Sequence, residues 1–135
     1  MNTTTTTDPY PEVRVPAGAV FVDEWQSVGT PDAWRLFDGS ERVIAAAPDP
    51  LSSFRSENGI GKREIRVFIG GVQNPEGAVH RNIVVGEIHP DNPITVKQAF
   101  ELGLALVELA FEAREMAKRD QQLDGLSDPE GSIEP

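Results

Sequence analysis

The sequence contains no cysteine in its 135 residues. Without thiol groups the chain forms no disulfide bond, offers no thiolate ligand to a metal and has no cysteine nucleophile. Histidine is scarce as well, because His80 and His89 are the only two. His89 alternates with Glu87 and Asp91, but this alternation lacks the ligand spacing typical of metal sites. We therefore predict no metal site.

Lysine and arginine are few relative to the acidic residues, 12 against 22, for a formal net charge of −10. Half of this excess lies in residues 120–135, which contain five acids and no base. Binding to a phosphate backbone needs clustered cations. A nucleic-acid partner is therefore not expected.

Long hydrophobic runs are also missing. No apolar segment approaches the ~20 residues that a membrane-spanning helix requires. Residues 1–10 lack the basic and apolar parts of a signal peptide. We therefore expect a cytoplasmic protein without a membrane partner.

Familiar catalytic motifs are absent too. Residues 59–62 (Gly-Ile-Gly-Lys) contain the glycine–lysine pair of a phosphate-binding loop. However, Ser56 stands where that loop needs its first glycine, and Arg63 stands where Ser or Thr would hold magnesium. No serine has the Gly-x-Ser-x-Gly setting of a nucleophile elbow. We predict no catalytic residue and no cofactor.

The strongest positive feature is an amphipathic helix over Ile94–Arg119. Thr95 and Gln98 have the spacing of a capping box, in which each side chain bonds to the other residue's amide. The following residues, 96–117, contain no proline and mostly strong helix formers.

At about 100° per residue, the helix has three faces. Charged residues form one narrow face, namely Lys97, Glu101, Glu108, Glu112, Glu115 and Arg119. A core face lies opposite, namely Ala99, Leu102, Leu106, Leu109, Ala110, Ala113 and Ala117. Between them runs an apolar stripe, Phe100, Leu104, Val107 and Phe111. This apolar stripe either belongs to the core of the same domain or contacts a partner, and we take it as the candidate interaction site.

The residues before the helix predict short strands joined by tight turns. Asp38-Gly39 suits the two-residue turn of a hairpin within Trp34–Ile44, and Asn74–Gly77 suits the turn of a second hairpin. The five expected strands are Val20–Gln26, Trp34–Phe37, Ser40–Ile44, Glu64–Ile69 and Ala78–Ile88. Strands followed by one helix predict an α+β fold, a five-stranded antiparallel meander-like sheet with the long C-terminal helix packed on one face.

This pattern predicts a single domain over residues 17–120. Residues 1–16 contain five consecutive threonines and three prolines, so we expect a disordered N-terminal tail. Residues 121–135 are acidic and are expected to form a disordered C-terminal tail.

The Thr95-x-x-Gln98-Ala99 start of a Leu/Ala-rich helix, placed after strands, resembles the last folded part of small uncharacterised proteins of actinobacteria and their phages. The resemblance covers Arg66 to about Arg119, and the sequence departs from it at Phe100 and Phe111, where the family has smaller residues. It implies a compact intracellular domain and assigns no catalytic residue.

Three functions fit these features. The first is a small cytosolic binding or assembly module that associates with a protein partner or with itself as a homodimer, and not an enzyme. The second is an enzyme with a site at the loop of residues 45–63, which is longer than most connections in compact domains. The third is an acidic mimic that binds a basic protein.

Overall fold

The computed structural model describes residues 7–46, 64–86, 88 and 93–127, with side chains up to residue 122. Its elements are β1 (Phe21–Val22), β2 (Arg35–Ile44), β3 (Ile65–Gln73), β4 (Val79–Val85) and α1 (Val96–Ser127). The strands form one antiparallel sheet in the order β1-β2-β3-β4. The predicted α+β class and meander order are confirmed, with four strands instead of five.

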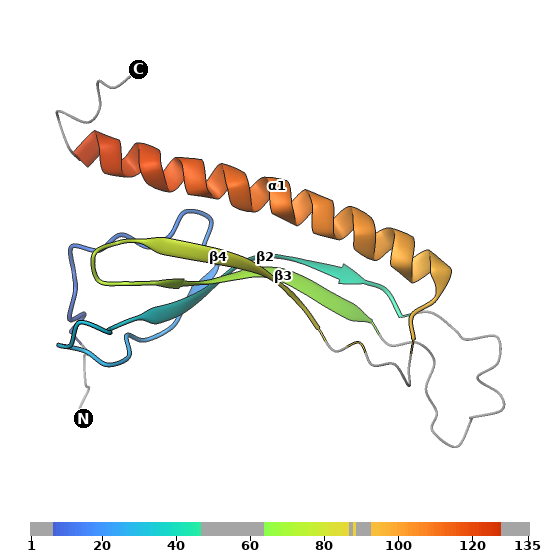
Figure 1. The fold of residues 1–135 in the computed structure, drawn as a ribbon, viewed down its shortest axis with the longest axis horizontal. Helices are drawn as coiled ribbons and strands as arrows, with labels where there is room; N and C mark the ends of the chain where they lie inside the picture. The colour runs from blue at the N-terminus through green and yellow to red at the C-terminus, as the bar shows by residue number, and fades with distance from the viewer. Residues whose placement is uncertain (1–6, 47–63, 87, 89–92, 128–135) are drawn as a thin grey trace.

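The molecule has two layers, and α1 runs along one face of the sheet (Figure 1). The residues of the main core cluster come from β2, β3 and α1, and they are Ile44, Ile65, Val67, Ile69, Ala105 and Leu109. Alternate residues of a strand point to opposite faces, so β3 supplies this core through Ile65, Val67 and Ile69. The other face of the sheet is not covered by any described helix or strand (Figure 1).

The predicted hairpin within Trp34–Ile44 is wrong, because this segment forms one continuous strand, β2. The register passes from Asp38↔Gly70 to Glu41↔Phe68, so two residues of β2 lie opposite Ile69 in a β-bulge. A type I′ turn needs positive φ at both central residues, and neither Asp38 nor the glycine after it has one. That glycine instead lies against Ile69, whose Cβ would be 3.2 Å from an added Cβ. Pairing with β3 along its length therefore prevails over the local turn preference.

The turn between β3 and β4 is confirmed. Gly77 has φ +93° and its N–H donates to the carbonyl of Asn74 at 2.9 Å. The side-chain oxygen of Asn74 accepts from the amides of Glu76 and Ala78, both at 3.0 Å. This turn sets the unbroken register from Val67↔Val85 to Gln73↔Val79.

The capping box at the start of α1 is confirmed as well. Thr95 Oγ1 accepts from the amide of Gln98, and Gln98 Oε1 accepts from the amide of Thr95, both at 3.0 Å. The Gln98 side chain is 1% exposed and its Nε2 donates to the carbonyl of Ala45 at 3.1 Å. The cap therefore also ties the helix start to the end of β2.

The helix continues to Ser127 instead of ending near Arg119. Asp120, on the added length, accepts from the amide of Ala17 at 2.8 Å and forms an ion pair with Arg81 at 2.7 Å. These contacts hold the C-terminal half of α1 against the N-terminal segment and β4.

Residues 7–16 lie against the sheet, which differs from the disorder expected for residues 1–16. The hydroxyl of Tyr10 accepts from the amide of Gly29 at 2.8 Å, and its ring lies edge-on to Trp25 with centroids 4.9 Å apart. Gln73 donates to the carbonyl of Arg14 at 2.9 Å. These are long-range contacts, so the composition of the segment gave no sign of them. Residues 1–6 and 128–135 of the two predicted tails lie outside the described residues.

Gly71 lies where β3 comes very close to the backbone of β4 and to the Phe37 ring of β2. A Cβ at this position would lie 2.4 Å from the carbonyl oxygen of His80 and 2.5 Å from Phe37 Cζ. We expect Gly71→Ala to lower the free energy of unfolding by more than about 2 kcal/mol, because backbone must move. Gly70→Ala is the matched control, since its Cβ would meet only side chains at 3.3 Å or more and a carboxylate oxygen at 3.9 Å. Equal losses in urea titrations of the two variants would contradict this account.

Deletion of residues 1–16 should lower the melting temperature by at least about 4 °C, because it removes the hydrogen-bond acceptor of Gln73 and uncovers Trp25. Thermal unfolding followed by circular dichroism measures the change. Tyr10→Phe, which removes only the hydroxyl, should have a smaller effect. A deletion variant with the same melting temperature as the full chain would show that these contacts add no stability.

Candidate interaction surface

One face of α1 packs on the sheet, and Leu109, 0% exposed, lies at its centre. Gln98 and Ala105 are also buried, and Leu102 and Met116 are half-buried. These positions recur every three or four residues, so they share one side of the helix. The buried side is rotated from the predicted core face, on which Ala99 and Ala110 prove to be exposed.

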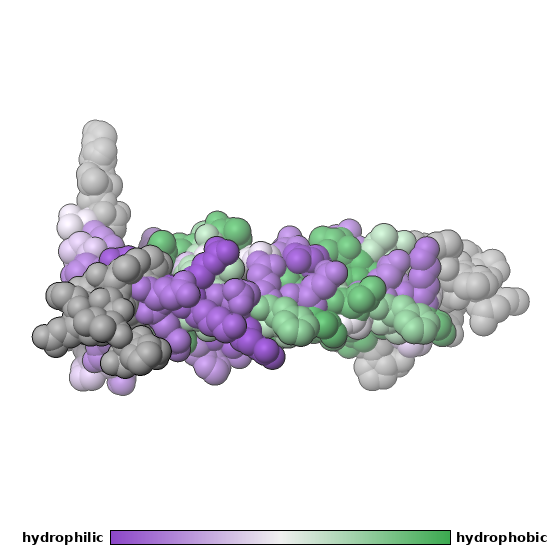
Figure 2. Space-filling view, turned by 90° about the horizontal axis from the view of Figure 1, so that it is seen from above, coloured by the Kyte–Doolittle hydropathy of each residue, from purple (hydrophilic) through white to green (hydrophobic). Residues whose placement is uncertain are grey.

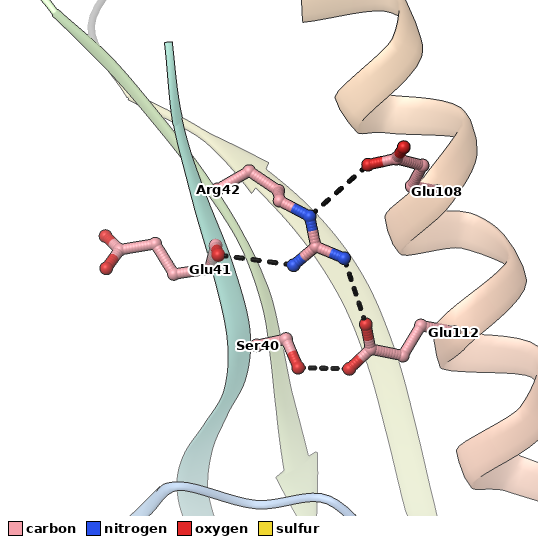
Figure 3. Close-up of polar contacts among 5 residues, drawn as sticks. All are labelled: Ser40, Glu41, Arg42, Glu108 and Glu112. Carbon is pink, nitrogen blue, oxygen red and sulfur yellow. Dashed lines mark hydrogen bonds and ion pairs between the residues drawn. The ribbon is translucent and has the colours of Figure 1, made fainter. Parts of the chain in front are cut away.

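A polar cluster connects β2 to this helix. Arg42 extends from β2 towards α1 and reaches Glu108 and Glu112, each with an N–O distance of 3.4 Å (Figure 3). Ser40 also donates a hydrogen bond to Glu112, and Arg42 donates to the carbonyl of Glu41 at 3.3 Å. The bulge in β2 places Ser40 on the helix side of the sheet. Because Arg42 and Glu108 are substantially exposed, at 37% and 56%, these pairs orient the helix more than they stabilise the fold.

A second cluster holds the other side of α1. The side chain of Arg81 on β4 is 8% exposed, and it pairs with Asp120 and donates to the carbonyl of Ala17 at 3.0 Å. Its guanidinium carbon lies 5.5 Å from the centroid of the Phe37 ring. A buried, hydrogen-bonded pair of this kind is costly to break on one side only. The rotation of the helix about its axis is therefore fixed by contacts along most of its length.

This rotation points the apolar stripe away from the sheet. Phe100 is 74% exposed, Leu104 64%, Val107 54% and Phe111 58%. At about 100° per residue, all four lie roughly opposite Leu109 around the helix axis. The view onto α1 shows hydrophobic side chains among hydrophilic ones over its N-terminal half and mostly hydrophilic surface over its C-terminal half (Figure 2). The stripe thus takes no part in the core that the structure describes.

The two sides of the stripe differ in chemistry. At about 100° per residue, Glu101, Glu108 and Glu115 follow one side, whereas Gly103 and Ala110 follow the other. Beyond Phe111, Arg114 and Lys118 take the outward positions. Small residues on one flank permit another helix to approach closely, as in tightly packed helix pairs.

The uncovered face of the sheet is a second exposed surface, and it is more mixed. Leu36 and Val72 are exposed there beside His80, with which Val72 pairs. Glu41 accepts a hydrogen bond from Arg66 on the same face, and this bond raises the pKa of Arg66. Polar and charged side chains among the apolar ones are typical of the solvent-facing side of an antiparallel sheet.

A buried arginine is the polar feature that the sequence gave no signal for. Arg35 is 6% exposed, donates to Gln73 Oε1 at 2.9 Å and lies 4.3 Å from the Trp25 ring centroid. Burial of its guanidinium lowers the pKa of Arg35, while the charge of Asp8 acts in the opposite direction. A recess of about 160 Å³ lies nearby, lined by Glu12, Val13, Arg14, Val15, Gln73, Pro75, Glu76, Gly77, Val79 and Asp120. Arg35 donates to Gln73, and Gln73 donates to the carbonyl of Arg14, so this chain of bonds attaches the N-terminal segment to the sheet.

Most of the remaining candidates from the sequence fall outside the described residues. Glu87, His89, Asp91 and residues 47–63 lie outside the described residues, and His80 is exposed mid-strand. Within the described ranges, no three His, Asp or Glu side chains are grouped so that they could hold a metal ion. No helix among these residues is long and apolar enough to cross a membrane.

Matched truncations to alanine distinguish the exposed apolar stripe from the buried side of α1. Leu109→Ala should lower the free energy of unfolding by about 2–5 kcal/mol, because it leaves a cavity in the core. Leu104→Ala should change it by less than about 0.5 kcal/mol in dilute solution, because its side chain is exposed. Urea titrations at low protein concentration compare the two, and similar losses would place Leu104 in the core.

Comparison of the chain with models of protein families, with curated proteins and with solved structures found no match. The function must therefore be inferred from the chain's own residues, and the apolar stripe is the described feature that most needs a chemical explanation.

Proposed function

We propose that this protein is a small binding and assembly module that associates with a second copy of itself through the apolar stripe. The observation that supports this proposal is the position of the stripe: four large apolar side chains lie on the side of α1 opposite the sheet, and each is more than half exposed. Single exposed apolar residues are common, but a contiguous apolar surface on a small domain usually marks an interaction site.

The spacing of the stripe fits a helix as the partner. Phe100 and Val107 are seven residues apart, and so are Leu104 and Phe111. Together they occupy two heptads of alternating three- and four-residue spacing, which is the pattern of a helix–helix seam. At about 1.5 Å per residue the stripe is roughly 17 Å long. A seam of this length favours a modest, concentration-dependent dimer.

The helix surface is a better candidate than the uncovered sheet face. On the sheet, the exposed Leu36, Val43, Val72 and Val84 share their face with charged groups that are already paired, such as Glu41 with Arg66. Burying that face would remove these charged groups from water, which costs free energy. The stripe contains no charged residue between Phe100 and Phe111 on its outward side.

The other two functions have less support among the described residues. An acidic mimic needs carboxylates free along one surface, yet Glu108 and Glu112 contact Arg42. An enzyme at the 45–63 loop would need acid–base groups that converge there. Residues 47–63 lie outside the described part of the chain, and the adjacent Glu64 is exposed.

The decisive variant is Leu104→Lys. We expect a folded protein of monomer mass in sedimentation equilibrium at concentrations where the parent chain is a dimer, because lysine is readily solvated once the partner has left. Circular dichroism checks that the fold is kept.

Val72→Lys is the matched control, because it places the same charge on the uncovered sheet face and should leave the dimer intact. A parent chain that stays monomeric at all accessible concentrations would contradict the proposal. So would dimerisation that survives Leu104→Lys and is lost in Val72→Lys, because it would assign self-association to the sheet.

A further inference from the structure

We propose that the two copies pair with their helices antiparallel, around a two-fold axis midway between Leu104 and Val107. This inference rests on the proposed self-association and adds the orientation and register of the second copy. Its basis is a symmetry in the apolar stripe. Phe100 precedes Leu104 by four residues, and Phe111 follows Val107 by four, so the stripe has the same spacing read in either direction.

An antiparallel pair turns this symmetry into matched contacts. Phe100 meets Phe111 of the second copy, and Leu104 meets Val107 of the second copy. Each contact occurs twice, as a two-fold axis requires. The phenylalanines then close both ends of the seam, and the smaller residues lie at its centre. The resulting assembly has four layers, sheet–helix–helix–sheet, with the uncovered sheet faces outermost.

Charges beside the seam fit the same register. In the antiparallel pair, Leu104 is level with Val107 of the second copy. Lys97 is seven residues before Leu104, and Glu115 is eight residues after Val107. Lys97 and Glu115 of the second copy therefore lie within one residue of the same level along the helix axis. At about 100° per residue, both lie on the same side of the stripe. A two-fold axis perpendicular to the helices brings like sides together, so each Lys97 is placed beside Glu115 of the second copy. Arg114 lies on the opposite side, where it is placed beside Val96 of the second copy.

The parallel arrangement brings like charges together instead. Lys118 lies on the outward side in line with the stripe, and in a parallel pair it would face its own copy. The helix C-termini would also lie side by side, and residues 120–127 of each helix contain Asp120 and Asp124 and no base. In the antiparallel pair, Lys118 lies level with Pro93 of the second copy, which precedes that helix. The antiparallel pair separates these groups, while it places Glu101 within two residues of the level of Glu108 of the second copy, on the side where Lys97 lies beside Glu115.

The absence of cysteine makes the orientation measurable by cross-linking. We prepare the full chain as Val96→Cys and as Arg114→Cys, two positions beside the stripe that keep all four of its residues. Both side chains are exposed. Each variant alone, and an equimolar mixture after subunit exchange, is treated with a short thiol-reactive cross-linker and examined by mass spectrometry. Sedimentation of the untreated variants establishes in parallel that they are dimers.

The antiparallel pair predicts a cross-linked dimer in the mixture, containing one chain of each variant, and at least tenfold less in either variant alone. In that pair, two copies of residue 96 are separated along the axis by about 28 Å, at ~1.5 Å per residue. Efficient cross-linking of each variant alone would overturn the antiparallel orientation and leave self-association through the stripe standing. Monomers in sedimentation would instead overturn the proposed function itself. Dimers without a cross-link in any sample would overturn the register.

Discussion

The burial of Leu109 against the sheet is the contact on which the rest of the structure depends. One helix must cover the inner face of a four-stranded sheet, and Leu109 lies at the centre of the side that does so, in one cluster with Val67 and Ile69 of β3. Because α1 is the only described helix, the choice of its buried side also decides its exposed side. The exposure of the apolar stripe is thus a direct consequence of core packing.

Polar contacts then fix the helix in that rotation. The capping glutamine Gln98 bonds to Ala45, Glu112 bonds to Ser40 and Arg42, and Asp120 bonds to Ala17 and Arg81. These three helix residues lie a few turns apart, so neither half of the helix can rotate about its axis without breaking a contact. The more exposed pair of Arg42 with Glu112 contributes little free energy, whereas the buried pair of Arg81 with Asp120 is costly to break on one side. All of these contacts define the orientation of the helix. A helix held in this way presents the stripe as a rigid surface, and a preorganised surface loses less entropy when it binds.

The proposed assembly function rests on this orientation of the helix. The described side chains contain an exposed apolar stripe and oriented charges, but no group of three His, Asp or Glu residues that could hold a metal ion. Arg35 is the most unusual ionisable group, and burial lowers its pKa. Its partners are Gln73 and the Trp25 ring, so its role is to join the N-terminal segment to the sheet.

The sequence alone determined the features that rest on local chemistry: the capping box at Thr95, the turn at Asn74–Gly77, the α+β class and the identity of the stripe residues. Each follows from spacing within one element. Tertiary structure decided what depends on distant residues. Pairing with β3 turned the expected Asp38-Gly39 hairpin into a bulged strand, because continuous strand pairing outweighs a turn preference. Contacts with Trp25 and Gln73 ordered residues 7–16, and packing on the sheet selected which apolar side of the helix is buried and which faces outward.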